Sequence, residues 1–271
     1  MLGKLIKHEI RHSARYHLTI MLATLVVTGI VGLSLLTDSA ILSALTCIAL
    51  FVTGIATVVV TLVSVIKNFY DTIYGRQGYL TLTLPVKGST ILLSKVLVSF
   101  LWIIVGFLMM LVPYLLIFFY AKIKTSALTD MFGDMLKGIL SMLPENEVLI
   151  LFLIVMAILI IAQILTYVGY VYFSVTVANT RLFHNHPKLF GGLTFFGIMV
   201  AVSQLGNIIG EILPFSFVVT YNDAFFSFQK ATEIPAAFII YPIGGTLFSM
   251  LVAVGLLGLT GYVIENKVNV K

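Results

Sequence analysis

The sequence contains one pattern of residues that is associated with metal chemistry. His8-Glu9-Ile10-Arg11-His12 fits H-E-x-x-H, in which two histidines one helical turn apart bind zinc and the glutamate acts as general base. Four basic side chains lie within or beside it and disfavour a dication: Lys4, Lys7, Arg11 and Arg15. A third ligand would have to come from far along the chain, from His184, His186 or Glu265. We interpret the pattern as a chance match and keep a membrane-embedded zinc metalloprotease using His8, Glu9 and His12 as an alternative.

Other chemistry-bearing residues are sparse. The chain lacks G-x-x-x-x-G-K-[ST], so it does not bind nucleotide phosphates through a P-loop. Gln163, Tyr167 and Tyr170 share one long apolar run and would suit a path for an amphipathic cargo. The alternatives are hydrogen bonding between helices for Gln163 and an aromatic belt near the lipid headgroups for the tyrosines. No catalytic, metal or cofactor residue is therefore assigned.

The composition is that of an integral membrane protein. Of 271 residues, 60% are hydrophobic and 10% are charged, and the mean hydropathy is +1.11. Soluble domains carry about 25% charged residues, so this chain cannot cover a water-facing surface. The net charge of +5 is typical of basic cytoplasmic loops and does not require nucleic acid as a partner. The single cysteine, Cys47, excludes an intrachain disulfide.

Six apolar runs predict an all-α protein with one transmembrane domain over residues 1–271. The spans are expected at about 18–36, 40–66, 96–120, 148–178, 189–209 and 236–264. Residues 1–17 alternate basic and apolar side chains at helical spacing, which predicts a separate amphipathic helix lying in the membrane interface. The predicted spans carry no Asp, Glu, Lys, Arg or His away from their ends, which argues against a self-powered, ion-coupled transporter.

The distribution of positive charge predicts the topology. Six spans place both termini on one side, and with the termini in the cytoplasm twelve of the sixteen Lys and Arg residues are cytoplasmic. The segment 67–95 is then a cytoplasmic loop. Its first part predicts a short helix with Phe69, Tyr70, Ile73 and Tyr74 available to a partner, ended by Gly75.

Part of this loop resembles a known family. The run GYLTLTLPVKGSTILLSKVLVSFLW, residues 78–102, is similar to a segment common in permease subunits of type-2 ABC exporters from Gram-positive bacteria. Those permeases carry a "gYLtltLPvs…ilisKll" pattern after the second span. LGKLIKHEIR at the N-terminus looks like the interfacial opening helix of the same family, with His8 where an aromatic residue is often found. The motifs cover about 1–12 and 67–102, and the layout of spans covers the whole chain.

The resemblance implies partners and roles. Such permeases pair as homodimers or heterodimers above two cytosolic ATPase subunits, which bind the ATP and Mg²⁺. A coupling helix after the second span contacts the ATPase, and here its residues would be Asn68, Phe69, Tyr70, Asp71, Ile73, Tyr74 and Gly75. A re-entrant segment between the fifth and sixth spans lies near the extracellular gate, and here it would include Pro214, Phe215 and Tyr221.

The resemblance also implies the function. The chain would perform no covalent chemistry and would supply the path for an amphipathic peptide, such as a toxin or antimicrobial, or for another hydrophobic cargo. Its expected location is the bacterial plasma membrane, in contact with lipid and without nucleic acid. A membrane partner that does not transport, such as an immunity or sensor subunit, is the further alternative.

Overall fold

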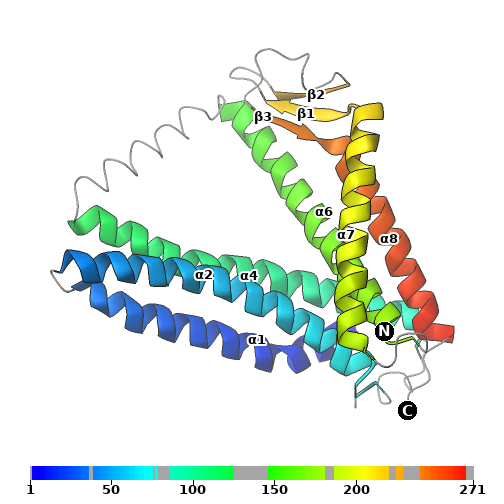
Figure 1. Ribbon diagram of the computed structural model, residues 1–271, viewed down its shortest axis with the longest axis horizontal. Coiled ribbons are helices and arrows are strands. Elements are labelled where there is room, and N and C mark those ends of the chain that lie inside the picture. Colours follow the sequence, from blue (N-terminus) through cyan, green and yellow to red (C-terminus); the bar gives the residue numbers. More distant parts are fainter. Residues whose placement is uncertain are drawn as a thin grey trace. The chain divides into compact units, whose positions relative to one another are not determined.

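The computed structural model describes residues 2–36, 39–75, 77–78, 86–124, 146–180, 186–219, 224–228 and 239–266. The chain divides into two compact units near residue 134. Unit 1 contains the first three long helices, coloured blue to green in Figure 1, and unit 2 contains the last three and a small sheet, coloured green to red. Each unit is described by itself below.

Unit 1 is a bundle of three long helices. It comprises α1 (Leu2–Leu33), the short 3-10 turn η1 (Ser34–Leu36), α2 (Ala40–Ile73) and α4 (Gly88–Lys124). Each long helix packs against the other two. The Ser39 side chain caps α2 by accepting a hydrogen bond from the Leu42 amide. Near the middle of α1 and α2, the Thr24 and Thr57 hydroxyls lie 3.1 Å apart and join the two helices.

Unit 2 joins three helices to a sheet. The helices are α6 (Asn146–Ala178), α7 (Pro187–Ile212) and α8 (Ile243–Asn266). The strands are β1 (Ser216–Val219), β2 (Ala224–Ser227) and β3 (Ile239–Pro242), all antiparallel in the order β2-β1-β3. Phe217 and Val219 of β1 pack with Val155 of α6 and Ile243 of α8 in one apolar cluster, so the sheet is anchored on the helices of its own unit.

The expectation of a six-span membrane protein is confirmed at this level. Six helices are long and apolar enough to cross a bilayer, and they correspond one for one to the predicted spans.

Two neighbouring helices of unit 1 extend beyond their predicted spans at the same end of the bundle. α2 continues from the predicted limit at residue 66 to Ile73, and α4 begins at Gly88 rather than at residue 96.

The amphipathic segment 1–17 and the first span form one helix. α1 continues without a break from Leu2 to Leu33, in place of the separate interfacial helix that the charge pattern predicts. Its buried residues follow one another every three or four positions through the expected junction: Glu9, Ser13, His17, Met21, Thr24 and Thr28. Because this single stripe packs against the bundle along its whole length, nothing favours a bend near residue 17.

The segment between α7 and α8 was predicted to be re-entrant. Its described residues form three short strands. Aromatic and β-branched residues favour strands, and Phe217, Val218 and Val219 are fully buried in β1. Tyr221 lies outside the described residues. The aromatic character of this segment therefore serves strand packing in the part of it that the structure describes.

Candidate functional site

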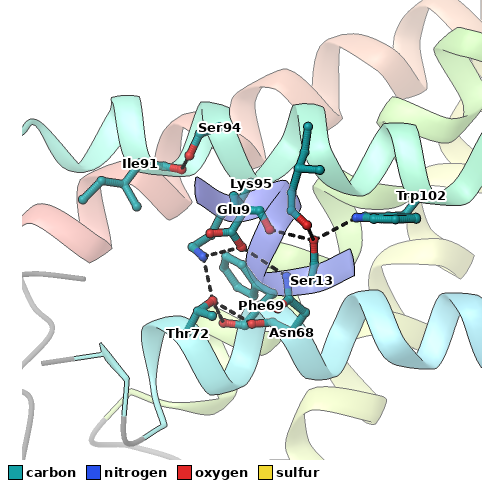
Figure 2. A network of polar contacts seen from close by, with 10 residues as sticks. Glu9, Ser13, Asn68, Phe69, Thr72, Ile91, Ser94, Lys95 and Trp102 are labelled. Atoms are coloured by element: carbon teal, nitrogen blue, oxygen red, sulfur yellow. Dashed lines mark hydrogen bonds and ion pairs between the residues drawn. The ribbon is translucent and has the colours of Figure 1, made fainter. Parts of the chain in front are cut away.

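A buried polar cluster lies where three helix ends of unit 1 meet. The first part of α1 supplies Glu9, the last turns of α2 supply Asn68 and Thr72, and the first turns of α4 supply Lys95 (Figure 2). Lys95 Nζ donates to Glu9 Oε1 at 2.9 Å and to Thr72 Oγ1 at 2.6 Å. Asn68 Nδ2 donates to the same Glu9 oxygen at 3.1 Å. Each of the three helices therefore contributes at least one polar side chain to the cluster.

The burial of this cluster makes its charges interdependent. The side chain of Lys95 is 2% exposed and that of Glu9 is 11% exposed. A buried ammonium or carboxylate without a partner is costly, because the charge loses its hydration. The ion pair and its hydrogen bonds are therefore satisfied only while α1, α2 and α4 keep their positions relative to one another. The cluster fixes these three helix ends as one body.

A second group of polar contacts continues the cluster into the bundle. Ser13 Oγ donates to the Glu9 carbonyl at 2.7 Å, and Trp102 Nε1 donates to Ser13 Oγ at 2.8 Å (Figure 2). The His17 ring stacks on Trp102 with ring centroids 4.4 Å apart. His17 Nδ1 donates to the Ser13 carbonyl at 3.0 Å, and Nε2 lies 2.8 Å from Ser64 Oγ of α2. These contacts again involve all three helices.

The surroundings of Glu9 bear on the H-E-x-x-H pattern. In a zinc protease the Glu9 carboxylate would act as a base, and here one of its oxygens, Oε1, accepts hydrogen bonds from Lys95 and Asn68. His8 is exposed and His12 is half-buried. Among the described residues, no three His, Cys, Asp or Glu side chains lie close enough to hold a metal ion. His184 lies outside the described residues, and His186 and Glu265 belong to unit 2. The geometry gives Glu9 a structural partner.

The expected ATPase-coupling residues divide into two sets. They form the last turns of α2 and the turn after it, and not a separate helix. Phe69 and Ile73 were predicted to be available to a partner. Both are fully buried inside unit 1, so their side chains cannot contact one. Asn68 belongs to the buried cluster. The remaining residues are at least partly exposed at the C-terminal end of α2, which we call its tip: Tyr70, Asp71, Tyr74 and Gly75. A Cβ on Gly75 would lie 2.7 Å from the Asp71 carbonyl oxygen, so the turn needs glycine.

Unit 2 holds a cavity of about 1030 Å³. It is lined by α6, α7 and α8, by the residues just before β1, and by residues of β1 and β3. Four residues expected to form a path or gate line it together: Gln163, Tyr170, Pro214 and Phe215. The Tyr170 hydroxyl donates to the Ser249 carbonyl of α8 at 3.3 Å. Tyr167 does not line this cavity; its ring packs edge-on against Phe195 of α7, with centroids 5.8 Å apart.

The cavity has a polar side that sequence reasoning missed. Ser203, Asn207 and Glu211 follow one another every four residues on α7, all exposed and all lining the cavity. This spacing places them on one face of the helix. Three polar residues spaced four apart in an otherwise apolar run are the sequence signal that could have identified this side of the cavity. Among the described residues that line the cavity, Glu211 is the only charged one.

The fold and these two sites define a helical, multi-pass membrane protein with a buried ion pair in one unit and, in the other, a cavity with one polar side. Comparisons with protein-family models, with curated proteins and with solved structures find no match for this chain.

Proposed function

We propose that the chain is the transmembrane permease subunit of an ATP-driven exporter of the type-2 ABC class. In this proposal it pairs with a second permease copy or a paralogue, and separate cytosolic ATPase subunits bind ATP and Mg²⁺. Both termini lie in the cytoplasm of a bacterial cell, and the chain spans the plasma membrane. The cargo is an amphipathic peptide or another hydrophobic molecule.

The observation that carries this proposal is the buried cluster at the end of unit 1. α2 has 34 residues and is about 51 Å long at 1.5 Å per residue, whereas a hydrocarbon core is about 30 Å thick. Its last turns therefore project well beyond the apolar layer. Lys95, Glu9 and Asn68 tie this projecting end to α1 and α4. A force applied at the tip of α2 would move three membrane helices together, as a coupling element requires.

The exposed residues at the tip support the same role. Tyr70 is 37% exposed, and Asp71, Tyr74 and Gly75 are partly exposed beside it. Tyrosines are frequent anchors in protein interfaces because each offers a rigid apolar body and one polar group. The tip follows the buried residues Phe69 and Ile73, which hold it against the bundle. We therefore place the ATPase contact on the outward set of the expected coupling residues.

The cavity of unit 2 supports a transport path rather than an enzyme site. Its lining combines apolar residues with polar side chains and one carboxylate, Glu211, which suits an amphipathic molecule. In the proposed mechanism, ATP binding closes the ATPase pair, and this closure displaces the tip of α2. Unit 1 responds as one body, and the permease halves alternate between states in which the path opens to different sides.

The test is isolation of the chain from its native membrane with whatever binds it. The proposal expects a P-loop ATPase to copurify with it. Asp71→Arg and Tyr70→Ala should each weaken that complex, about tenfold for an interface anchor. Tyr262→Ala is the matched control, because Tyr262 is an exposed tyrosine at the end of α8. If no ATPase copurifies, the proposal fails. If both tip variants keep the ATPase as the wild type does, the interface lies elsewhere.

A further inference from the structure

We propose that the cavity of unit 2 binds an amphiphile carrying a single cation, and that Glu211 receives the cationic group. The ligand class is a primary ammonium or guanidinium joined to an uncharged body with apolar and polar parts. As a statement about cargo, this inference rests on the proposed export function. Four features of unit 2 point to this ligand: the packing of α7 against α8, a polar stripe on α7, an unpartnered hydroxyl and the charge of the cavity.

The packing of α7 against α8 makes the cavity a fixed feature of unit 2. The two backbones approach closely at Gly206 and Gly245, where a Cβ on Gly245 would lie 2.9 Å from the Gly206 carbonyl oxygen. Small residues allow membrane helices this approach. Gly244 is held as closely, since a Cβ there would lie 2.6 Å from the Leu213 carbonyl oxygen. The cavity lies beside this contact and is bounded by α6.

The polar stripe of α7 needs a polar neighbour. Ser203, Asn207 and Glu211 are exposed on a helix that is otherwise apolar enough to span a membrane. Polar and ionisable side chains facing hydrocarbon are costly, so such residues usually face a cavity, water or a partner group. All three line the cavity of unit 2. The stripe therefore gives one wall of the cavity side chains that can form hydrogen bonds with the polar groups of a ligand.

A further observation concerns a buried hydroxyl among the residues that line the cavity. Ser216, the first residue of β1, lines the cavity and is 5% exposed. Its Oγ is buried and has no hydrogen-bond partner within the part of the chain that the structure describes. Buried hydroxyls are satisfied in the great majority of cases, because an unpaired one costs free energy. A polar group of a ligand in the cavity, met by rotation of the Ser216 side chain, would supply the missing partner.

The charge of the cavity selects the sign of the ligand. Among its described lining residues, Glu211 carries the only formal charge, and no Lys or Arg offsets it. The remaining wall includes Met199, Val202 and Phe215, which suit an apolar body. At the edge of a low-dielectric layer, a carboxylate favours a cation and repels an anion more strongly than it would in water. The cavity is therefore suited to an amphiphile with one positive group.

The experiment uses a reporter inside the cavity. Ser203→Cys is introduced in a Cys47→Ser background, and the full chain is placed in nanodiscs of zwitterionic lipid. The rate at which a maleimide labels the introduced cysteine is measured in the presence of one added compound at a time. The compounds are a long-chain alkylammonium, the alcohol of the same length and the carboxylate of the same length. We expect only the alkylammonium to slow labelling strongly. Leu205→Cys is the control, because Leu205 is exposed on the same helix at nearly the same depth but does not line the cavity.

Variants of Glu211 then test the assignment of the cationic group. Glu211→Gln should weaken protection by the alkylammonium about tenfold, and Glu211→Asp should retain most of it. Glu211→Lys should shift protection to the carboxylate analogue. Glu265→Gln removes an acid from α8 outside the cavity and should change nothing. Equal protection by all three compounds, or full protection in Glu211→Gln, would overturn the proposal.

A second measurement separates this proposal from the export function. The complex with its ATPase is reconstituted, and ATP hydrolysis is measured with and without the alkylammonium. Protection of Ser203→Cys without any change in ATP hydrolysis would keep the binding site and count against export. Stimulation that is unchanged in Glu211→Gln would keep export and overturn the cationic site.

Discussion

Glu9 and Glu211 are both carboxylates on helices apolar enough to span a membrane, and their surroundings are opposite. Glu9 is buried in unit 1, where Lys95 and Asn68 both donate to its Oε1. Glu211 is exposed in unit 2, where the described residues offer it no ion pair. A paired, buried carboxylate holds helices together, whereas an exposed one beside a cavity remains available to a ligand.

The same contrast extends to the other polar residues of the two units. In unit 1, Ser13, Ser64, His17 and Trp102 bond to one another across three helices. In unit 2, the Tyr170 hydroxyl reaches a backbone carbonyl of α8, and Ser203, Asn207 and Glu211 line the cavity. Buried side-chain atoms without a partner among the described residues occur in both units: His12 Nδ1, Thr28 Oγ1 and Asn68 Oδ1 in unit 1, and Ser216 Oγ in unit 2. Unit 1 uses its bonded polar groups to hold its three helices together. Unit 2 leaves part of its polar surface facing a cavity.

Lys95→Met should give the largest effect on stability. It leaves the Glu9 carboxylate buried without its cation, which costs about 3–5 kcal/mol when one partner of a buried pair is removed. The measurement is reversible unfolding in mixed detergent and SDS micelles, followed by circular dichroism. The double variant Glu9→Gln with Lys95→Met should recover much of the loss, because no charge then remains unpaired.

Lys67→Met is the control for that experiment. Lys67 is an exposed lysine on α2, near the ring of Tyr16 and outside the ion pair. Its removal should cost about 1 kcal/mol or less. An equal loss in Lys67→Met and Lys95→Met would show that positive charge in general, and not the buried pair, stabilises unit 1.

Gly245→Ala should destabilise unit 2 by about 1–3 kcal/mol, because the new methyl group would force α7 and α8 apart. The nearest atom, the Gly206 carbonyl oxygen, lies 2.9 Å from the added Cβ and belongs to backbone that cannot rotate away. Gly197→Ala on α7 is the matched control, since a Cβ there meets nothing within 4 Å. The same unfolding assay should show no loss for the control; equal losses would contradict the close contact of the two helices.

Much of the fold could be predicted from the sequence, and the reason lies in the membrane. Runs of about twenty apolar residues have one stable form in a bilayer, so the number of helices follows from hydropathy. The ends are less determined. α2 and α4 continue beyond their predicted spans because Phe69, Ile73 and Ile91 pack inside unit 1. Hydropathy does not register such packing outside the apolar layer.

The candidate sites were harder to predict, for two different reasons. Glu9 and Lys95 are 86 positions apart, and each reads as an ordinary charge flanking a span. Only the packing of three helices brings them together. The strands after α7 are four residues each, too short to give a clear alternation. The polar stripe of α7 is different, because its three residues lie four positions apart and this spacing is visible in the sequence: Ser203, Asn207 and Glu211.

Trp102→Phe should cost unit 1 about 1–2 kcal/mol, because Ser13 loses the hydrogen bond from Nε1 and His17 loses part of its stacking surface. Phe119→Leu on the same helix is the control, since Phe119 is exposed and should be nearly neutral. Unfolding followed by circular dichroism measures both. A neutral Trp102→Phe would show that the second group of contacts adds little to the ion pair.

Glu211→Gln should have the smallest effect on stability, within about 0.5 kcal/mol, because an exposed carboxylate without an ion pair loses nothing when it becomes an amide. Glu9→Gln, the same substitution in unit 1, should cost several times more, since Lys95 would then be buried without its anion. Comparing the two variants in one assay tests the contrast between the units directly. If Glu211→Gln proves as destabilising as Glu9→Gln, then Glu211 is itself a structural partner, and its carboxylate is not held available for a ligand.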